Sequence, residues 1–195
     1  ALMRHRNGRP LTASEPRPGA DGYPVIVGAS DASRREGSFF GAAGGWFRFW
    51  GSQTVFFFSR QWAPEVVEAH NISELEMVGA NMLAHLADKV ATATVAQESM
   101  YYLYQFGDNE SVFRHCLNGF HAGTTGMRRL LAQRARADYQ CNRMAVAAHV
   151  FREENKASDA LANLDEETFV AEIRQQLPRA QFVRLHVPAD IAALP

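Results

Sequence analysis

Four carboxylates stand where strands end or helices begin, which are places where protein chains commonly present ligands. Asp31 and Asp108 each follow an apolar run, whereas Glu76 and Asp159 fall near the starts of helical segments. Strand ends collect ligands at the edge where neighbouring strands run parallel. Hard oxygen ligands suit Mg²⁺ or Mn²⁺ rather than zinc, and carboxylates this close repel one another unless cations neutralise them. The four residues together therefore predict a divalent-metal site.

Each of these residues taken alone has a structural alternative. Asp31 fits a turn, Asp108 fits the cap of a helix, and Asp159 favours a helix start through the helix dipole. Ser73 and Glu76 have the spacing of a capping box, in which each side chain accepts a hydrogen bond from the other residue's backbone N–H. Taken singly, the structural interpretation is the simpler one, so the prediction of a metal site depends on all four being placed together.

The elements that must position these residues alternate between strands and helices. Apolar and aromatic runs predict strands at 25–29, 38–50, 54–62, 100–106 and 144–150, the second and third joined as a hairpin through Gly51-Ser52. Apolar residues at three- and four-residue spacing predict helices at 73–95, 109–118, 125–139, 156–163 and 166–177. This order predicts an α/β fold with a five-stranded mixed sheet flanked by helices, in which strands one to three are antiparallel and strands four and five run parallel to strand one.

The composition is that of one globular domain. The chain has 195 residues, 47% hydrophobic and 21% charged, which excludes wholesale disorder and collagen-like repeats. No apolar stretch reaches the roughly 18 residues of a membrane span, and the first residues lack the apolar run of a signal peptide. With only Cys116 and Cys141 there is no disulfide framework, so we expect an intracellular, reducing location (cytoplasm or nucleus), no secretion and no membrane partner. Residues 1–22, rich in proline and glycine, predict a linker or arm, 23–165 the domain, and 166–195 a C-terminal helical tail.

Charge is distributed unevenly, although the formal net charge is only −1. Residues 111–152 hold seven arginines against a single acid, Asp138, whereas residues 153–176 are mainly acidic. Arginine binds phosphate with a planar, bidentate guanidinium that lysine lacks, so the basic stretch suits a phosphate backbone. A solvated helix face in an arginine-rich chain is the simpler alternative.

Four short blocks follow one another between residues 23 and 163. They are Gly28-Ala-Ser-Asp31-Ala-Ser33, Ile72-Ser-Glu-Leu-Glu76-Met-Val-Gly-Ala80, Phe106-Gly-Asp108-Asn-Glu-Ser-Val112 and His149-Val-Phe-Arg-Glu-Glu-Asn155-Lys-Ala-Ser-Asp159-Ala-Leu161. In these blocks the chain resembles the ribonuclease H domain of retroelement (retrotransposon-type) reverse transcriptases, and the last block is the most specific. The resemblance implies a ribonuclease H-like fold and a metal-dependent endonuclease that hydrolyses the RNA strand of RNA–DNA hybrids.

The resemblance also implies the roles of individual residues. Two Mg²⁺ ions, with Mn²⁺ as a substitute, would be held by Asp31, Glu76, Asp108 and Asp159, with Asp31 bridging both. His149 would assist proton transfer or product release. Glu74 competes with Glu76 for the second position, but Leu-Glu-Met at 75–77 fits the family better. Gly79 and Gly107 depart from the family pattern and leave every ligand in place.

The substrate implied by the resemblance is an RNA–DNA hybrid. Such hybrids are recognised through 2′-hydroxyl groups and phosphates, for which Asn109, Ser111 and Asn155 are candidates near the carboxylates. Candidate phosphate contacts are Arg128, Arg129, Arg134 and Arg136. A polymerase domain upstream of residue 1 is the expected partner in a full-length protein, with the proline- and glycine-rich arm as the connection.

Other classes remain open at this point. An exonuclease or resolvase on the same fold shares the carboxylates, and a catalytically silent nucleic-acid-binding domain derived from a retroelement shares the fold. A haloacid-dehalogenase phosphatase needs a second Asp two residues after Asp31, where Ser33 stands. His149 and the Asn-x-x-Ser-Asp-Ala-Leu block favour ribonuclease H.

Overall fold

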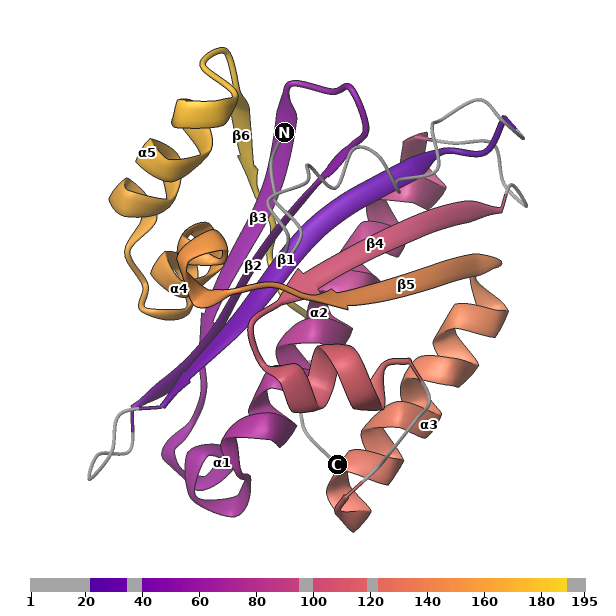
Figure 1. The fold of residues 1–195 in the computed structure, drawn as a ribbon, viewed down its shortest axis with the longest axis vertical. Helices are drawn as coiled ribbons and strands as arrows, with labels where there is room; N and C mark the ends of the chain where they lie inside the picture. Colours follow the sequence, from indigo (N-terminus) through magenta and orange to yellow (C-terminus); the bar gives the residue numbers. More distant parts are fainter. Residues whose placement is uncertain (1–21, 35–39, 95–99, 119–122, 189–195) are drawn as a thin grey trace.

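The computed structural model describes residues 22–34, 40–94, 100–118 and 123–188, which form one mixed sheet with helices packed on it (Figure 1). The six strands lie in the order β5-β4-β1-β2-β3-β6. They are β1 (Val25–Arg34), β2 (Gly41–Phe49), β3 (Thr54–Gln61), β4 (Tyr101–Gly107), β5 (Arg143–His149) and β6 (Gln181–Arg184). The helices are α1 (Pro64–Ala69), α2 (Ile72–Thr94), α3 (Thr125–Gln140), α4 (Lys156–Ala162) and α5 (Glu166–Gln176), with a π-helix η2 (Ser111–Cys116) and a 3₁₀ turn η3 (Arg152–Glu154). The predicted fold class is confirmed: β1 to β3 are antiparallel, and β4 and β5 run parallel to β1.

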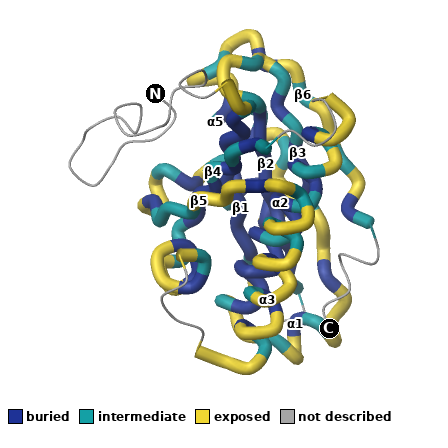
Figure 2. The backbone as a smooth tube through the Cα atoms, turned by 90° about the vertical axis from the view of Figure 1, so that its right-hand side faces the viewer, coloured by how far each residue is buried: buried dark blue, intermediate teal, exposed yellow. Residues whose placement is uncertain are grey.

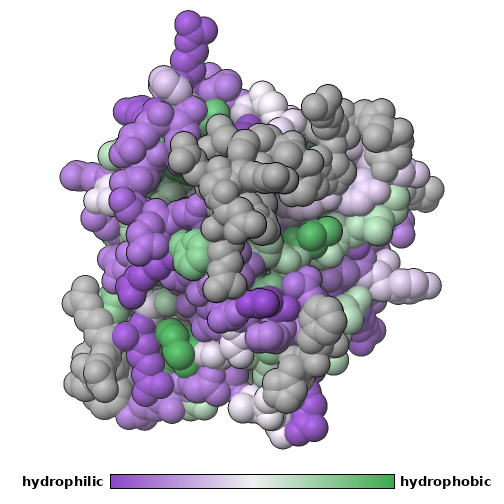
Figure 3. Space-filling view, in the orientation of Figure 1, coloured by the Kyte–Doolittle hydropathy of each residue, from purple (hydrophilic) through white to green (hydrophobic). Residues whose placement is uncertain are grey.

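Side chains of the central strands alternate between two hydrophobic clusters, one on each face of the sheet. Phe47 and Phe58 pack with α2 in the first cluster, whereas Trp46 and Phe57 pack with α4 and α5 in the second. The buried residues run through the middle of the molecule in Figure 2. The sheet edge at β5 is less covered: Met144 and Val146 are exposed there, and apolar side chains gather over β4 and β5 in Figure 3.

A glycine in β2 sets how closely α4 approaches the sheet. A Cβ atom on Gly44 would lie 2.4 Å from the backbone of Leu161 and Ala162, so only glycine permits this contact. Gly44 pairs with Asp31 across the β1–β2 ladder. The small residue therefore brings α4 close to the end of β1.

The structure adds elements that the periodicity does not predict. The segment after α5, expected to be part of a helical tail, contains β6, which pairs parallel with β3 and makes the sheet six-stranded rather than five-stranded. Phe169 and Ile173 of α5 are buried against the sheet, so this region packs on the core. A short helix α1 precedes α2, and the helix expected at 109–118 is the π-helix η2. Residues 1–21 of the arm predicted at 1–22 lie outside the described residues. Among the described residues, no helix has the length and apolar character needed to cross a membrane.

Candidate metal centre

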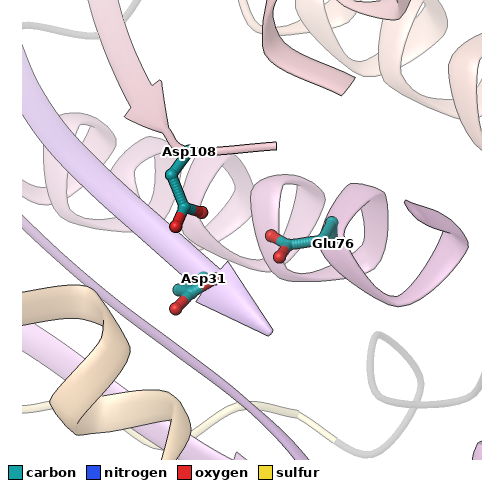
Figure 4. Close-up of side chains that lie close together, drawn as sticks. All are labelled: Asp31, Glu76 and Asp108. Atoms are coloured by element: carbon teal, nitrogen blue, oxygen red, sulfur yellow. The ribbon is translucent and has the colours of Figure 1, made fainter. Parts of the chain in front are cut away.

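Three carboxylates from three different elements converge at one edge of the sheet (Figure 4). Asp31 lies in β1, Glu76 in α2, and Asp108 directly after β4. One oxygen atom from each lies within 4.8 Å of the others. The register explains the first pair, since Ala29 of β1 is paired with Phe106 of β4 and each carboxylate follows two residues later. Parallel neighbours thus carry Asp31 and Asp108 to the same edge and the same face, as predicted.

Burial makes this cluster electrostatically unfavourable without a cation. Asp31 and Glu76 are buried, and Asp108 is half-buried. Burial, with a further contribution from the neighbouring carboxylates, raises the pKa of Asp31 to about 7. For the same reasons the pKa of Glu76 lies well above its usual range, and burial also raises the pKa of Asp108. Within the described part of the chain, Glu76 Oε2 is buried with no hydrogen-bond partner.

These features fit a divalent cation. Three desolvated carboxylates repel one another, and a hard cation bound to their oxygens removes that repulsion while giving the orphaned Glu76 oxygen a partner. The donor set contains only oxygen, which suits Mg²⁺ or Mn²⁺ better than zinc. The residues present therefore fit the metal that the sequence predicts.

The start of α2 decides between the two glutamates that competed for this site. The capping box expected of Ser73 and Glu76 is instead made by Asn71 and Glu74. The Glu74 N–H donates to Asn71 Oδ1 at 3.0 Å, and the Asn71 N–H donates to Glu74 Oε2 at 3.4 Å. Glu74 also accepts a hydrogen bond from the Thr124 hydroxyl, which caps α3. Glu74 thus ties two helix starts together, and Glu76 is left to face Asp31.

Glu74 also differs from Glu76 in its electrostatics. Although burial raises the pKa of Glu74, hydrogen bonds from Thr124 and His70 bring it below the usual value. A carboxylate with these partners is satisfied as an anion. Glu74 therefore has no need of a metal ion.

The fourth predicted carboxylate, Asp159, lies beside the cluster and not in it. Asp159 stands in the first turn of α4 and forms an ion pair with Arg152 at 3.6 Å. Its charge still contributes to the raised pKa values of Asp31 and Asp108. Arg152 was not predicted as a site residue; the available signal was its place between His149 and Asn155 in the most specific block.

His149 and Asn155 both contact Asp108. His149 Nε2 lies 3.0 Å from the Asp108 backbone oxygen, and its ring meets the ring of Phe151 edge-on. Asn155 is buried and its Nδ2 lies 3.5 Å from Asp108 Oδ1. These two residues therefore frame the third carboxylate.

Two further predicted substrate contacts lie just after Asp108. Asn109 Oδ1 accepts a hydrogen bond from the Val112 N–H at 3.2 Å, so its side chain supports the start of η2. Ser111 is the exposed first residue of η2. Both lie near the carboxylates, with Ser111 the more accessible.

The structure separates the four predicted phosphate contacts of α3. Arg128, Arg129 and Arg136 are exposed. Arg134 is buried, and its guanidinium bonds Asp138 at 2.9 and 3.0 Å. The prediction for Arg134 is corrected, because its side chain points into the protein between α3 and the sheet and is not presented to a nucleic-acid backbone.

Comparison with known proteins identifies the fold. No protein-family model matches the chain, and neither does any curated protein. Among solved structures, the chain is similar to the N-terminal RNase H domain of Rv2228c from Mycobacterium tuberculosis, with 16% identity, a TM-score of 0.51, and coverage of 78% of this chain and 98% of that one.

Two other structures are similar at lower TM-scores. RNase H1 from the halophilic archaeon Halobacterium salinarum NRC-1 is 17% identical with a TM-score of 0.47, covering 73% of this chain and 98% of that one. LC11-RNase H1 in complex with an RNA/DNA hybrid is 14% identical with a TM-score of 0.47, covering 74% of this chain and 99% of that one. The likeness to the mycobacterial domain, together with the strand order, shows that this chain has a ribonuclease H-like fold.

Proposed function

We propose that this chain is a ribonuclease H, an endonuclease that uses divalent cations to hydrolyse the RNA strand of an RNA–DNA hybrid. The observation that carries the proposal is the convergence of Asp31, Glu76 and Asp108 on one edge of a ribonuclease H-like sheet. The similar mycobacterial structure is itself named as an RNase H domain. The products would be a 3′-hydroxyl and a 5′-phosphate.

The cluster suits two Mg²⁺ ions, with Mn²⁺ able to replace them. Asp31 lies on an inner strand of the sheet and would contact both ions, with Glu76 and Asp108 completing one site. Asp159 would complete the other by turning from its exposed ion pair with Arg152, a contact that holds it weakly. When bound, such ions activate a water molecule and stabilise the leaving oxygen of the phosphodiester.

His149 is placed to handle a proton beside the site. Its Nε2 faces the Asp108 backbone oxygen, which only accepts hydrogen bonds, so Nε2 carries the hydrogen. Nδ1 is then the atom that takes up and returns a proton. A histidine held in this position suits delivery of a proton to the leaving group or release of product.

The substrate would be held mainly through its phosphates. Arg128, Arg129 and Arg136 are exposed on α3 and carry the charge that such contacts need. Ser111 and Asn109 lie near the carboxylates where 2′-hydroxyl groups of the RNA strand would pass, whereas Asn155 is buried and would act by holding Asp108. These contacts give affinity and discrimination between RNA and DNA without reading base sequence.

The four sequence blocks extend the proposal to the origin of the domain. Their resemblance to retroelement reverse transcriptases supports a polymerase domain upstream in the full-length protein. Sequencing the gene upstream of Ala1 tests this point, and an unrelated upstream region would contradict it.

The proposed activity is tested with a labelled RNA–DNA hybrid in Mg²⁺, with single-stranded RNA and duplex DNA as parallel substrates. We expect cleavage of the hybrid's RNA strand alone. Asp108→Asn should abolish it with an unchanged circular-dichroism spectrum, and Glu167→Gln, an exposed carboxylate on α5, should leave it intact. Cleavage of duplex DNA would indicate another nuclease of this fold. Hybrid binding without Mg²⁺ binding or cleavage would indicate a silent nucleic-acid-binding domain.

A further inference from the structure

A buried glutamine in β4 touches the two other elements that carry the carboxylates. Gln105 is fully buried, and its Nε2 donates to the Ala80 backbone oxygen of α2 at 2.8 Å. The same nitrogen lies 3.5 Å from Ser30 Oγ of β1. One side chain of β4 thus reaches both β1 and α2.

Each of these contacts lies close in sequence to a carboxylate. Gln105 precedes Asp108 by three residues, and Ser30 directly precedes Asp31. Ala80 follows Glu76 by four residues, about one helical turn. The glutamine therefore connects the three segments whose relative positions determine the distances between the carboxylate oxygens.

Arg134 fixes which way round the Gln105 amide lies. Arg134 Nη1 donates to Gln105 Oε1 at 3.0 Å. A guanidinium only donates hydrogen bonds, and a carbonyl only accepts them. Turning the amide over would place its NH₂ group against the guanidinium and its oxygen against the Ala80 oxygen, so only one orientation satisfies both neighbours.

The arginine is itself held on its other side. Arg134 is paired with Asp138 through its Nε atom, and Asp138 also accepts from Arg143. Burial lowers the pKa of Arg134 to about 10, which leaves it charged at neutral pH. The network consequently runs without a break from α3 to the sheet beneath the metal site.

We propose that Gln105, oriented by Arg134, is a positioning residue that holds α2 against β1 and β4 so that the oxygens of Asp31, Glu76 and Asp108 meet around a cation. The inference rests on the proposed function, since it concerns the same metal site. Metal coordination tolerates errors of only about 0.2 Å in ligand position. A side chain that locks the three ligand-bearing elements together therefore affects metal affinity without contacting the metal.

A purely structural role for this network makes a different prediction, and Tyr101 provides the matched control. Tyr101 lies in the same strand as Gln105, and its hydroxyl joins the far end of the network, at Arg143 and Asp88. Asp88 is twelve residues along α2 from Glu76, about three helical turns away. Tyr101→Phe thus removes buried hydrogen bonds from β4 and α2 without loosening the contact nearest the carboxylates.

The test is the dissociation constant for Mg²⁺, measured by isothermal titration calorimetry on the full chain at pH 8. We expect Gln105→Met to weaken Mg²⁺ binding about tenfold, the lower end of the range for residues that act through a metal ligand. Tyr101→Phe should stay within about twofold of the unchanged protein. The double variant Gln105→Met/Arg134→Met removes both partners of the Arg134–Gln105 hydrogen bond and leaves Asp138 paired with Arg143. It should bind Mg²⁺ as weakly as Gln105→Met whatever its stability.

The outcomes separate this inference from the function on which it rests. If the unchanged protein binds Mg²⁺ and Gln105→Met binds it equally well, the positioning role is wrong and the metal site stands. If Tyr101→Phe weakens binding as much as Gln105→Met, or the double variant regains affinity along with melting temperature, the network acts through stability and the inference is also wrong. Absence of Mg²⁺ binding by the unchanged protein would overturn both.

Discussion

Neutralising Asp31 should stabilise the metal-free protein at alkaline pH while removing its metal site. Burial raises the pKa of this carboxyl from 3.8 to about 7, so between these values the folded protein holds a proton that the unfolded chain has lost. The free energy of unfolding then falls as the pH rises from about 4 and levels off above 7. Between pH 5 and pH 8 the loss is on the order of 3 kcal/mol.

Asp31→Asn removes the charge that causes this loss. The amide oxygen can still accept the Ala32 N–H that Asp31 Oδ1 accepts at 2.8 Å, so little local structure is lost. In EDTA the variant should match the unchanged protein near pH 5 and exceed its free energy of unfolding by a few kcal/mol at pH 8. Urea denaturation at pH 5, 7 and 8 measures this difference.

The response to Mg²⁺ should also distinguish Asp31→Asn from the unchanged protein. Added to the unchanged protein at pH 8, it should raise the free energy of unfolding by binding the folded state alone. The same addition should leave Asp31→Asn unchanged, and Glu167→Gln should respond to Mg²⁺ as the unchanged protein does. An Asp31→Asn variant that is less stable than the unchanged protein at pH 8 in EDTA would refute the electrostatic reasoning.

Four further variants test the roles assigned to individual residues. Glu74→Gln should lower the free energy of unfolding by about 1–3 kcal/mol in urea and leave Mg²⁺ affinity unchanged, because the Glu74 carboxylate accepts hydrogen bonds at two helix starts and faces no metal. A tenfold loss of Mg²⁺ affinity would return Glu74 to the site. Arg134→Met should destabilise the protein by about 3–5 kcal/mol, because it breaks a buried ion pair. Arg129→Met should change stability by less than about 0.5 kcal/mol and reduce the salt dependence of hybrid binding by about one charge. Equal losses of stability in the two variants would contradict the assignment of Arg134 as buried and Arg129 as exposed. His149→Ala should slow hybrid cleavage about 100-fold with Mg²⁺ affinity retained, and an unchanged turnover number would exclude a role in proton transfer.

The core of the site is predictable because it follows from strand direction. Asp31 lies near the end of β1 and Asp108 directly follows β4, two strands that a long crossover helix makes parallel, and equal offsets from paired residues bring them together. The strand and helix periods place most of these elements within a few residues of their observed ends, but β1 continues beyond its predicted end at residue 29 to Arg34. The sequence therefore contains the fold class and the proximity of these two carboxylates.

The choice between Glu74 and Glu76 depends on contacts that the local sequence does not contain. Asn71 with Glu74 and Ser73 with Glu76 have the same three-residue spacing, and each pair satisfies the pattern of a capping box. The structure favours the first pair partly because Thr124, fifty residues away, donates to Glu74. Only the tertiary fold reveals that contact.

The run of arginines in α3 is misleading on its own, because it does not reveal that Arg134 is buried. Arg134 shares the buried face of α3 with Met127 and Leu130, and it stands four residues before Asp138. The four-residue spacing from Arg134 to Asp138 is typical of an ion pair within a helix. A search for periodic apolar residues does not include arginine, so it does not predict that Arg134 is buried.

The strand β6 is also absent from the local sequence pattern. It is only four residues long, and its residue Phe182 is positioned by packing on Phe169 of α5.

The most direct test of the metal site is a crystal of the protein grown with Mn²⁺, measured at the wavelength where manganese scatters anomalously. We predict anomalous density among the side-chain oxygens of Asp31, Glu76 and Asp108, at about 2.2 Å from the nearest carboxylate oxygens, and a second peak toward Asp159 when an uncleaved hybrid is bound. Anomalous density elsewhere on the protein, with these three carboxylates free of metal, would contradict the central claim.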